Sequence, residues 1–288
     1  MILITGGTGF VGRRLAARLI AQGESVRLLA RKHADVPGAE VHPGNVRDVA
    51  SVLSAARGCT AVIHLVGIIR ETRGATFAGV HVGGTRTVLQ ACQEAGVPRL
   101  LHMSALGARP NARSAYHGTK WAAEESVRAS GLPATIFRPS VIFGAGGEFL
   151  PTIRRLVQSP GPVIPIVGDG LSLLQPIWIE DVVSCFVAAV GRTSSPPLGT
   201  YELGGPETIG FEELVDLIAA DEGVDKPKLH LPTLLARPAV ALLSRLLPGF
   251  PLTSDQLTML VEDNVCDITE MTKTFEVMPA TLREHLRD

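Results

Sequence analysis

Short apolar runs alternate with amphipathic stretches through the first half of the chain. The apolar runs cover residues 1–4, 25–30, 61–66, 99–104 and 133–138. Between them lie helical patterns, one of which spaces Val11, Leu15 and Leu19 along a single face and closes at Gly23. Strands that alternate with helices form parallel sheets covered on both faces. The pattern therefore predicts an α/β fold built on a doubly wound parallel sheet.

The local composition of the sequence changes after Pro139, where glycines and prolines become frequent, as in "FGAGGEFLP" and "SPGPVIPIVGDG". We predict a sheet-forming core over residues 1–143 and a mixed region over residues 144–288. Within the mixed region, the segment from about 173 to 205 is expected to return to the core. The remainder is expected to form a small C-terminal substrate lobe.

Composition argues against several classes of function. A net charge of -1 over 288 residues provides no field that would attract nucleic acid. The four cysteines are scattered, without the spacing of a metal site, at Cys59, Cys92, Cys185 and Cys266. Buried thiols suit a reducing compartment, and no signal or transit pattern precedes "MILIT". We therefore expect a cytoplasmic protein without a metal.

The longest apolar region covers residues 231–250. It contains Arg237, Arg245 and several prolines, so it is not expected to span a membrane. A lobe helix that packs its leucines inward is the simpler interpretation. Contact of this segment with a membrane surface or with a larger complex stays open, and no oligomeric state is predicted.

A glycine array follows the first predicted strand and opens the first predicted helix, in "TGGTGFVG". Glycines at this point permit a tight turn and close approach of a pyrophosphate, and the helix N-terminus offers free N–H groups to the anion. The array predicts a Rossmann core that binds a dinucleotide. The residues expected at this part of the site are Gly6, Thr8, Gly9, Phe10, Val11 and Gly12.

The end of the second predicted strand bears on the choice of cofactor. An NAD site places an acid there, whereas the 2′-phosphate of NADP favours arginine. This chain has Arg31 and Lys32 there, and the first acid after this strand is Asp35. The residues therefore predict NADP(H) rather than NAD(H), with a solvated basic loop as the alternative.

The stretch "SAYHGTK" sets Tyr116 and Lys120 four residues apart, on one face of a predicted helix. A phenol has a reference pKa of about 10, which a nearby ammonium and a cationic nicotinamide would lower. Such a pair moves protons in an enzyme, although Lys120 could equally hold a nicotinamide ribose without turnover. His117 faces elsewhere on the helix and is interpreted as a surface or packing residue.

Together with "GNVRD", "VIHLVG", "FRPSVIFG" and "PIWIEDVV", these motifs resemble the extended branch of the short-chain dehydrogenase/reductase superfamily over nearly the whole chain. The resemblance implies that Tyr116, Lys120 and Ser104 are catalytic. It also implies that the dinucleotide contacts Asn45, Val46, Leu65, Val66, Gly67, Lys120, Pro139, Val141 and Ile142.

More narrowly, "HMSALGARPNARSAYHGTKWAAEESVRASG" is similar to an atypical group. This group contains the NADPH-binding accessory subunit of respiratory complex I and bacterial proteins labelled sugar-nucleotide epimerases. Three features depart from the active members of the extended branch. Ser104 stands one place early without a second Ser/Thr, His81 replaces an asparagine, and the segment before the Tyr116 helix is short.

Three functions follow from these residues and the resemblance. The first is an NADP(H)-dependent oxidoreductase that acts on a carbonyl or alcohol of an apolar or amphipathic small molecule, with Tyr116 as the proton donor or acceptor. The second is a non-catalytic NADPH-binding protein that docks on a larger complex. The third is a nucleotide-sugar epimerase or dehydratase, for which Arg154 and Arg155 are the available cations, although both also fit a solvated helix face.

Overall fold

The computed structural model describes residues 1–32, 34–191, 197–234, 240 and 253–287. The chain divides into two compact units, each built from separate segments of the sequence. The first unit contains Met1–Pro139, Ile179–Leu203 and Asp267–Met278. The second contains Ser140–Trp178, Gly204–Cys266 and Pro279–Asp288.

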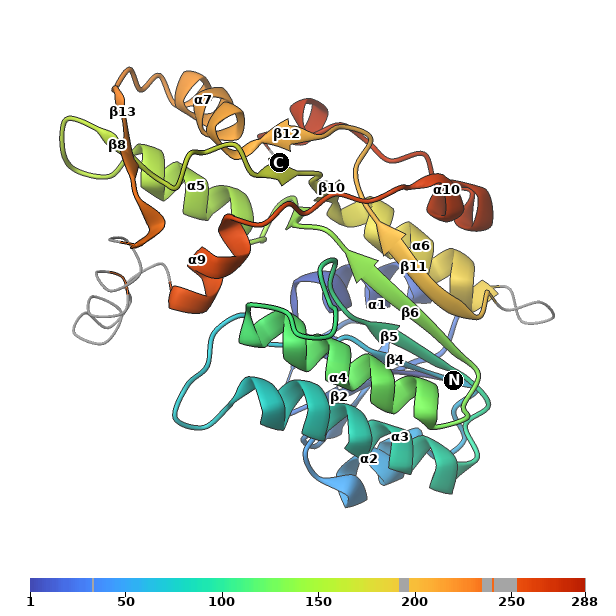
Figure 1. Ribbon diagram of the computed structural model, residues 1–288. Helices are drawn as coiled ribbons and strands as arrows, with labels where there is room; N and C mark the ends of the chain where they lie inside the picture. Colours follow the sequence, from blue (N-terminus) through green and yellow to red (C-terminus); the bar gives the residue numbers. More distant parts are fainter. Residues whose placement is uncertain (33, 192–196, 235–239, 241–252, 288) are drawn as a thin grey trace. The chain divides into compact units, whose positions relative to one another are not determined.

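The first unit is built on a seven-stranded sheet in which every pairing is parallel (Figure 1). The strand order is β11-β6-β5-β4-β1-β2-β3. The strands are β1 (Ile2–Thr5), β2 (Val26–Ala30), β3 (Ala39–Pro43), β4 (Ala61–His64), β5 (Leu100–Met103), β6 (Ala134–Pro139) and β11 (Gly199–Leu203). This order confirms the predicted doubly wound α/β fold.

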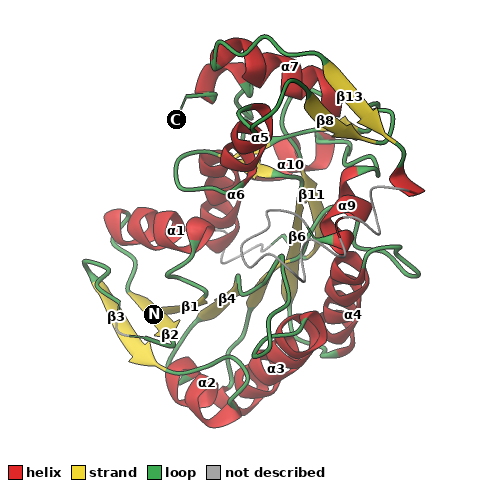
Figure 2. Ribbon diagram, turned by 90° about the vertical axis from the view of Figure 1, so that its left-hand side faces the viewer, coloured by secondary structure: helices red, strands yellow, loops and turns green. Residues whose placement is uncertain are grey.

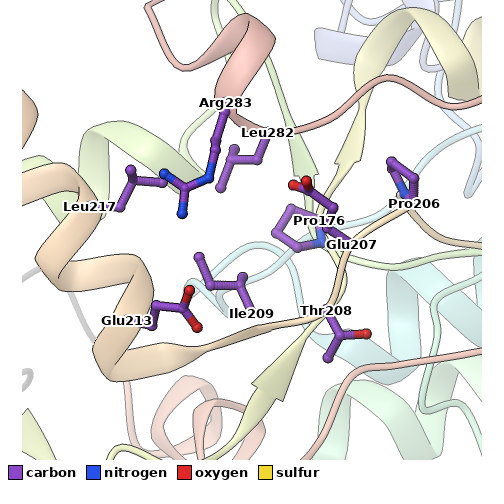
Figure 3. A pocket seen from close by; sticks show the side chains of 9 residues that line it. All are labelled: Pro176, Pro206, Glu207, Thr208, Ile209, Glu213, Leu217, Leu282 and Arg283. Carbon is purple, nitrogen blue, oxygen red and sulfur yellow. The ribbon is translucent and has the colours of Figure 1, made fainter.

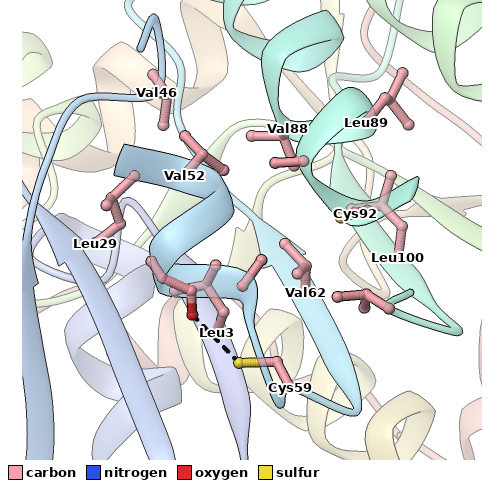
Figure 4. Close-up of a cluster of buried hydrophobic side chains, with 14 of the residues drawn as sticks. Leu3, Leu29, Val46, Val52, Cys59, Val62, Val88, Leu89, Cys92 and Leu100 are labelled. Atoms are coloured by element: carbon pink, nitrogen blue, oxygen red, sulfur yellow. Dashed lines mark hydrogen bonds between the residues drawn. The ribbon is translucent and has the colours of Figure 1, made fainter. Parts of the chain in front are cut away.

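Helices cover both faces of this sheet (Figure 2). One face carries α2 (Val49–Ala56), the π-helical turn η1 (Ala78–Gly83), α3 (Gly84–Ala95) and α4 (Ala115–Ala129). The other carries α1 (Phe10–Ala21) and α6 (Ile179–Gly191), and α10 (Thr269–Phe275) packs on α6 and β11. Between the sheet and the first group lies an apolar core (Figure 4) formed by side chains such as Leu3, Val62, Leu100, Val52 and Val88.

Local signals explain where these helices begin and end. The Asp48 carboxylate accepts the N–H groups of Ala50 and Ser51 at the start of α2, and the Ser114 hydroxyl accepts the N–H of His117 at the start of α4. Helix α3 ends at Gly96, whose φ of 67° a side chain would strain. The N-cap residue of helix α1 is Gly9, which provides no side-chain cap, so the first N–H groups of the helix have no intrahelical partner.

The described part of the second unit packs helices beside several short strand pairs. Its helices are α5 (Phe149–Val157), α7 (Phe211–Asp221), α9 (Ser254–Leu260) and the 3₁₀ turn η2 (Arg283–His285). Its strands are β7 (Ile142–Phe143), β8 (Ile164–Val167), β9 (Leu173–Leu174), β10 (Ile177–Trp178), β12 (Ile209–Gly210) and β13 (Lys228–Leu231). Buried residues of α5, α7 and β8, including Ile153, Leu214 and Ile166, form its apolar core.

The boundaries of the units differ from the sequence prediction in three places. The core was predicted to end at residue 143, but Ser140 already belongs to the second unit. In the segment predicted to return, α6 and β11 belong to the first unit, whereas residues 173–178 form β9 and β10 of the second. Helix α10 belongs to the first unit, and its polar sequence, with only Met271 and Phe275 buried, gave no signal of this return.

Most of the apolar region predicted as a lobe helix, namely residues 235–239 and 241–250, lies outside the described residues. In the part of the chain that is described, no helix has the length and apolar character needed to cross a bilayer.

Candidate functional site

The strand order reverses beside β1, which lies between β2 and β4. The chain therefore leaves β1 and β4 in opposite directions, and open α/β sheets bind their ligands at the crevice that this creates. The loop after β1 contains Gly6 and Gly9, and the loop after β4 contains Val66 and Gly67. These two loops meet, because a Cβ on Gly6 would lie 3.2 Å from the backbone N of Val66.

The loop after β1 is shaped for an anion. Gly6 has a φ of 80°, and the Gly9 N–H donates to the Gly6 carbonyl at 3.0 Å. A Cβ at Gly12 would lie 2.2 Å from the Gly6 oxygen, so no side chain fits there. The glycines thus bring the backbone and the uncapped N-terminus of the 12-residue helix α1 close to any group bound in the crevice. Thr8, Phe10 and Val11 occupy the same turn.

Basic residues follow strand β2, and a polar loop follows strand β3. Arg31 and Lys32 directly follow β2 and are exposed. The guanidinium of Arg13, also exposed, donates to the Thr8 carbonyl at 2.9 Å and so folds back over the glycine loop. After β3, Asn45 is partly exposed and Val46 is buried. These residues offer positive charge at the strand end where a ribose phosphate would be bound.

A cluster of side chains joins the loop after β4 to helix α4. A Cβ on Gly67 would lie 3.1 Å from Lys120 Nζ and 3.7 Å from His81 Nε2. The Lys120 ammonium lies 6.0 Å from the centre of the Tyr116 ring, and the His81 ring meets Tyr116 edge-on at 5.4 Å. The structure therefore places Tyr116 and Lys120, which their spacing put on one helix face, beside Gly67, and adds His81, which the sequence left as a departure from the pattern.

Lys120 is an unusually buried lysine, with 2% of its surface exposed. Its ammonium donates to the Met103 carbonyl at 3.0 Å. Burial lowers its pKa to about 8, and the Glu124 carboxylate partly opposes this shift. The charge is therefore present at neutral pH and held next to the Tyr116 ring at the carboxyl end of β5.

The Tyr116 side chain is partly exposed, and burial raises the pKa of its phenol to about 12. The sequence argument expected a nearby ammonium and a cationic nicotinamide to lower this pKa, whereas in the structure desolvation raises it. A neutral phenol at pH 7 is a proton donor. His117 is buried against Gly107, where a Cβ would approach its ring to 3.0 Å, so it is a packing residue.

Ser104 continues β5, and its N–H donates to the Phe137 carbonyl at 2.7 Å. It is 2% exposed, and its hydroxyl has no hydrogen-bond partner within the described part of the chain. A buried hydroxyl without a partner is rare and is suited to a ligand atom. The residue that follows is Ala105, which is also buried, so no second hydroxyl completes this strand end.

A row of polar side chains crosses the sheet below this cluster and was not predicted. The strand register sets Thr5, His64 and His102 side by side on β1, β4 and β5. His64 Nδ1 lies 2.6 Å from the Thr5 hydroxyl, and the two imidazoles stack with their centres 5.4 Å apart. Burial lowers the pKa of His64 to about 3 and holds that of His102 well below its usual value.

The remaining predicted residues are distributed over both units. Leu65 is buried after β4, and Pro139 ends β6 in the first unit. Val141 and Ile142 belong to the second unit, so their contact with a dinucleotide stays a prediction. In the second unit Arg154 pairs with Glu222 at 3.1 Å and donates to the Leu286 carbonyl, while the exposed Arg155 pairs with Glu148 at 3.3 Å. Both arginines thus have partners within their own unit.

The second unit contains a pocket of about 210 Å³ (Figure 3). Its apolar wall includes Ile209, Leu217 and Leu282, and Glu207, Glu213 and Arg283 supply its charges. No residue predicted from the sequence lines it.

Comparison with known proteins identifies relatives of this chain. The sequence profile of the NAD dependent epimerase/dehydratase family matches residues 2–204. The mitochondrial NADH dehydrogenase (ubiquinone) 1 alpha subcomplex subunit 9 of Arabidopsis thaliana is 31% identical over 227 residues, 75% of this chain and 56% of its own length. A ceramide reductase of Caulobacter vibrioides is 33% identical over 217 residues, 73% of this chain and 66% of its own length.

This chain therefore spans only 56% and 66% of the length of these two relatives. A solved dTDP-glucose 4,6-dehydratase of Streptomyces venezuelae with bound NAD superposes with a TM-score of 0.76. The alignment covers 99% of this chain and 94% of that one at 19% identity, and it shows a shared fold.

Proposed function

Because the chain belongs to the NAD dependent epimerase/dehydratase family, we propose that it is an NADP(H)-dependent oxidoreductase that acts on a carbonyl or alcohol of an apolar or amphipathic small molecule. Family membership and the complex I relative agree with the resemblance seen in the sequence. The observation that carries the proposal is the contact of Tyr116 with a buried Lys120, next to the loop after β4.

Reduction of a carbonyl requires a hydride on carbon and a proton on oxygen. A nicotinamide dinucleotide supplies the hydride chemistry when it is bound. Tyr116, with its phenol protonated at pH 7, donates the proton to the carbonyl oxygen. The Ser104 hydroxyl donates a hydrogen bond to the same oxygen, and the Lys120 ammonium stabilises the negative charge left on Tyr116.

An apolar substrate is supported by the second unit and by one relative. Among the described residues, Leu171, Leu229 and Leu234 expose 70%, 49% and 82% of their surface. The two arginines considered for a sugar diphosphate have acidic partners. The ceramide reductase, named for a lipid, is 33% identical to this chain. These observations favour a lipid-like carbonyl compound over a nucleotide sugar.

Tyr116→Phe tests the proposal directly. The parent chain with NADPH should reduce at least one member of a panel of long-chain ketones, quinones and aldehydes, monitored by loss of NADPH absorbance. The variant should turn over roughly a hundredfold more slowly, the usual share of general acid catalysis, because only the phenolic oxygen is removed. NADPH affinity measured by calorimetry should change by less than about 1.5 kcal/mol, a typical net hydrogen bond.

The chain offers a matched control, because Tyr201 is its only other tyrosine. Tyr201 lies on β11, and Tyr201→Phe should keep full activity. Full activity in Tyr116→Phe would rule out the proton-transfer role.

Cofactor preference gives a second test, through Arg31→Asp. This change replaces the cation after β2 with an acid, which repels a 2′-phosphate and can bind a ribose hydroxyl. NADPH affinity should fall roughly tenfold to hundredfold, while NADH affinity is kept or improved. Calorimetry with both dinucleotides measures this, and Arg86→Asp on α3 repeats the charge change at another exposed position. Equal affinities of the parent for the two cofactors would contradict the assignment.

Two observations favour a second candidate, a non-catalytic NADPH-binding protein that docks on a larger complex. Ser104 has no neighbouring second hydroxyl at the end of β5, and the relative that is 31% identical is named as a subunit of NADH dehydrogenase. Under that function the parent binds NADPH but oxidises it with no substrate of the panel. Lys120→Ala then weakens NADPH binding and Tyr116→Phe has no effect.

A further inference from the structure

His81 lies in the π-helical turn η1, one turn before helix α3 begins. A π-turn places its side chains differently from an α-helix and is often found at functional positions. Here it turns the imidazole inward, so that 1% of the residue is exposed. Each nitrogen of this ring meets a different segment of the first unit.

The Nδ1 atom of His81 lies 2.9 Å from the Thr119 hydroxyl on helix α4. That hydroxyl has one proton, and the carbonyls of Ala115 and Tyr116 lie 2.8 and 3.0 Å from it. The hydroxyl therefore donates to these carbonyls and accepts from Nδ1–H. The imidazole is thereby assigned as the Nδ1-protonated neutral tautomer.

In this tautomer Nε2 carries a lone pair. It lies 3.1 Å from both the backbone nitrogen and the carbonyl oxygen of Ile68, and in this tautomer it accepts the Ile68 N–H. Ile68 directly follows Gly67 in the loop after β4, which meets the glycine loop of β1. One imidazole thus connects the predicted cofactor loop to the helix that carries Tyr116 and Lys120.

The faces and edges of the same ring contact two aromatic side chains. Phe77 stacks on His81 with centres 5.4 Å apart and a 23° angle, and Tyr116 meets it edge-on at 87°. Phe77 also packs edge-on against Tyr116, at 5.9 Å. Together with His117, which meets Tyr116 edge-on at 5.5 Å, these two rings surround the Tyr116 ring with aromatic contacts.

We propose that His81 is a positioning residue with two separable functions: its Nε2 fixes the cofactor loop through Ile68, and its ring fixes the orientation of Tyr116. The second function rests on the proposed oxidoreductase activity, whereas the first concerns dinucleotide binding alone. The imidazole does not itself carry protons. Burial, with the charge of Lys120, lowers its pKa to about 3, so it is neutral throughout the neutral range.

Two substitutions separate these functions. His81→Phe keeps a ring against Phe77 and Tyr116 but removes the acceptor for Ile68. His81→Gln keeps an acceptor at the position of Nε2 but removes the ring. The measurements are NADPH affinity by calorimetry, exchange of the Ile68 amide by NMR with NADPH bound, and kcat at saturating NADPH.

The two variants should affect different quantities, NADPH affinity in His81→Phe and kcat in His81→Gln. In His81→Phe, NADPH affinity should fall about tenfold, the effect of one lost hydrogen bond, and the Ile68 amide should exchange faster, while kcat is kept. In His81→Gln, NADPH affinity should stay within about threefold of the parent, a smaller change than the loss of a typical hydrogen bond causes. The value of kcat should fall by roughly tenfold or more, because a loosely held Tyr116 is misplaced. A residue that merely fills space would make His81→Gln the worse variant in every measurement.

The affinity and exchange measurements need no turnover, so they test the loop function even if the parent proves inactive. Unchanged NADPH affinity in His81→Phe, or equal losses in the two variants, overturns the proposal. A third outcome also overturns it, namely an inflection in the kcat/KM profile of the parent between pH 5 and 9 that disappears in His81→Gln. That result would mean that His81 carries protons.

Discussion

Lys120→Met should make the folded chain more stable and at the same time weaken its binding of NADPH. Lys120 is 2% exposed, and its ammonium has one backbone carbonyl, that of Met103, as its hydrogen-bond acceptor within the described residues. A buried ammonium with so little compensation is destabilising, whereas methionine fills a similar volume without a charge. The burial of Lys120 is therefore best explained by a function in ligand binding. Replacement of a residue that is kept for function is expected to increase stability.

The pKa of Lys120 sets the size and the pH dependence of this effect. Burial lowers the pKa from 10.5 to about 8, which corresponds to roughly 3 kcal/mol of the free energy of unfolding. Below pH 8 the lysine is protonated in both the folded and the unfolded chain, so the full cost is present. As the pH rises from 8 to 10.5, the folded chain releases its proton before the unfolded chain does. The parent then approaches the stability of the variant.

Urea unfolding at pH 7 should therefore show a gain of about 1 to 3 kcal/mol in Lys120→Met, the upper value being the desolvation cost alone. NADPH affinity, measured by calorimetry, should fall by roughly tenfold to hundredfold, because one charge-assisted hydrogen bond is lost. Lys273→Met, at an exposed position of α10, should change neither quantity. A loss of stability together with unchanged NADPH affinity would show that Lys120 has a structural function instead.

The sequence predicted those parts of the fold that depend on local pattern. Strands such as β1 and β4 are buried on both faces, so every residue in them is apolar or internally paired and the runs are visible. Strand β3 was missed because, as an edge strand with the sequence "AEVHP", it is only partly buried. The two-residue strands β9 and β10 carry no periodicity at all, and they were assigned to the wrong unit.

The residues of the site were likewise predictable only where local sequence determines their arrangement. Gly6, Gly9 and Gly12 were predictable because the turn they form depends on neighbours in the sequence, and Tyr116 and Lys120 because a helix sets their spacing. The contact of His81 with both Ile68 and Thr119 depends on the packing of η1 against α4, segments 38 residues apart. The row of Thr5, His64 and His102 depends on the register of three strands. "VIHLV" and "LLHMS" share the pattern of one histidine near the end of a strand, which is the signal that could have linked them.

Acidification should unfold this chain at a pH where most folded proteins are stable, because three of its histidines are buried as neutral rings. Burial lowers the pKa of His64 and His81 to about 3, and burial together with the neighbouring cations holds that of His102 well below its usual value. In the unfolded chain each would titrate near 6.5. Below pH 6.5 the unfolded chain therefore binds more protons than the folded chain, so stability falls as the pH drops from 6.5 toward 3.

From pH 7 to pH 5 each buried histidine should remove up to about 2 kcal/mol from the free energy of unfolding, and the three together about 6. His102 is the residue with which to test this, because neither of its ring nitrogens has a hydrogen-bond partner within the described part of the chain. Urea unfolding at the two pH values should show that His102→Leu reduces the acid-induced loss by about a third relative to the parent. Leu100→Val, two residues earlier on β5 and without a titrating group, should cost the same stability at both pH values. If His102→Leu loses as much stability between pH 7 and 5 as the parent does, His102 is protonated in the folded chain and the buried row is not the source of acid sensitivity.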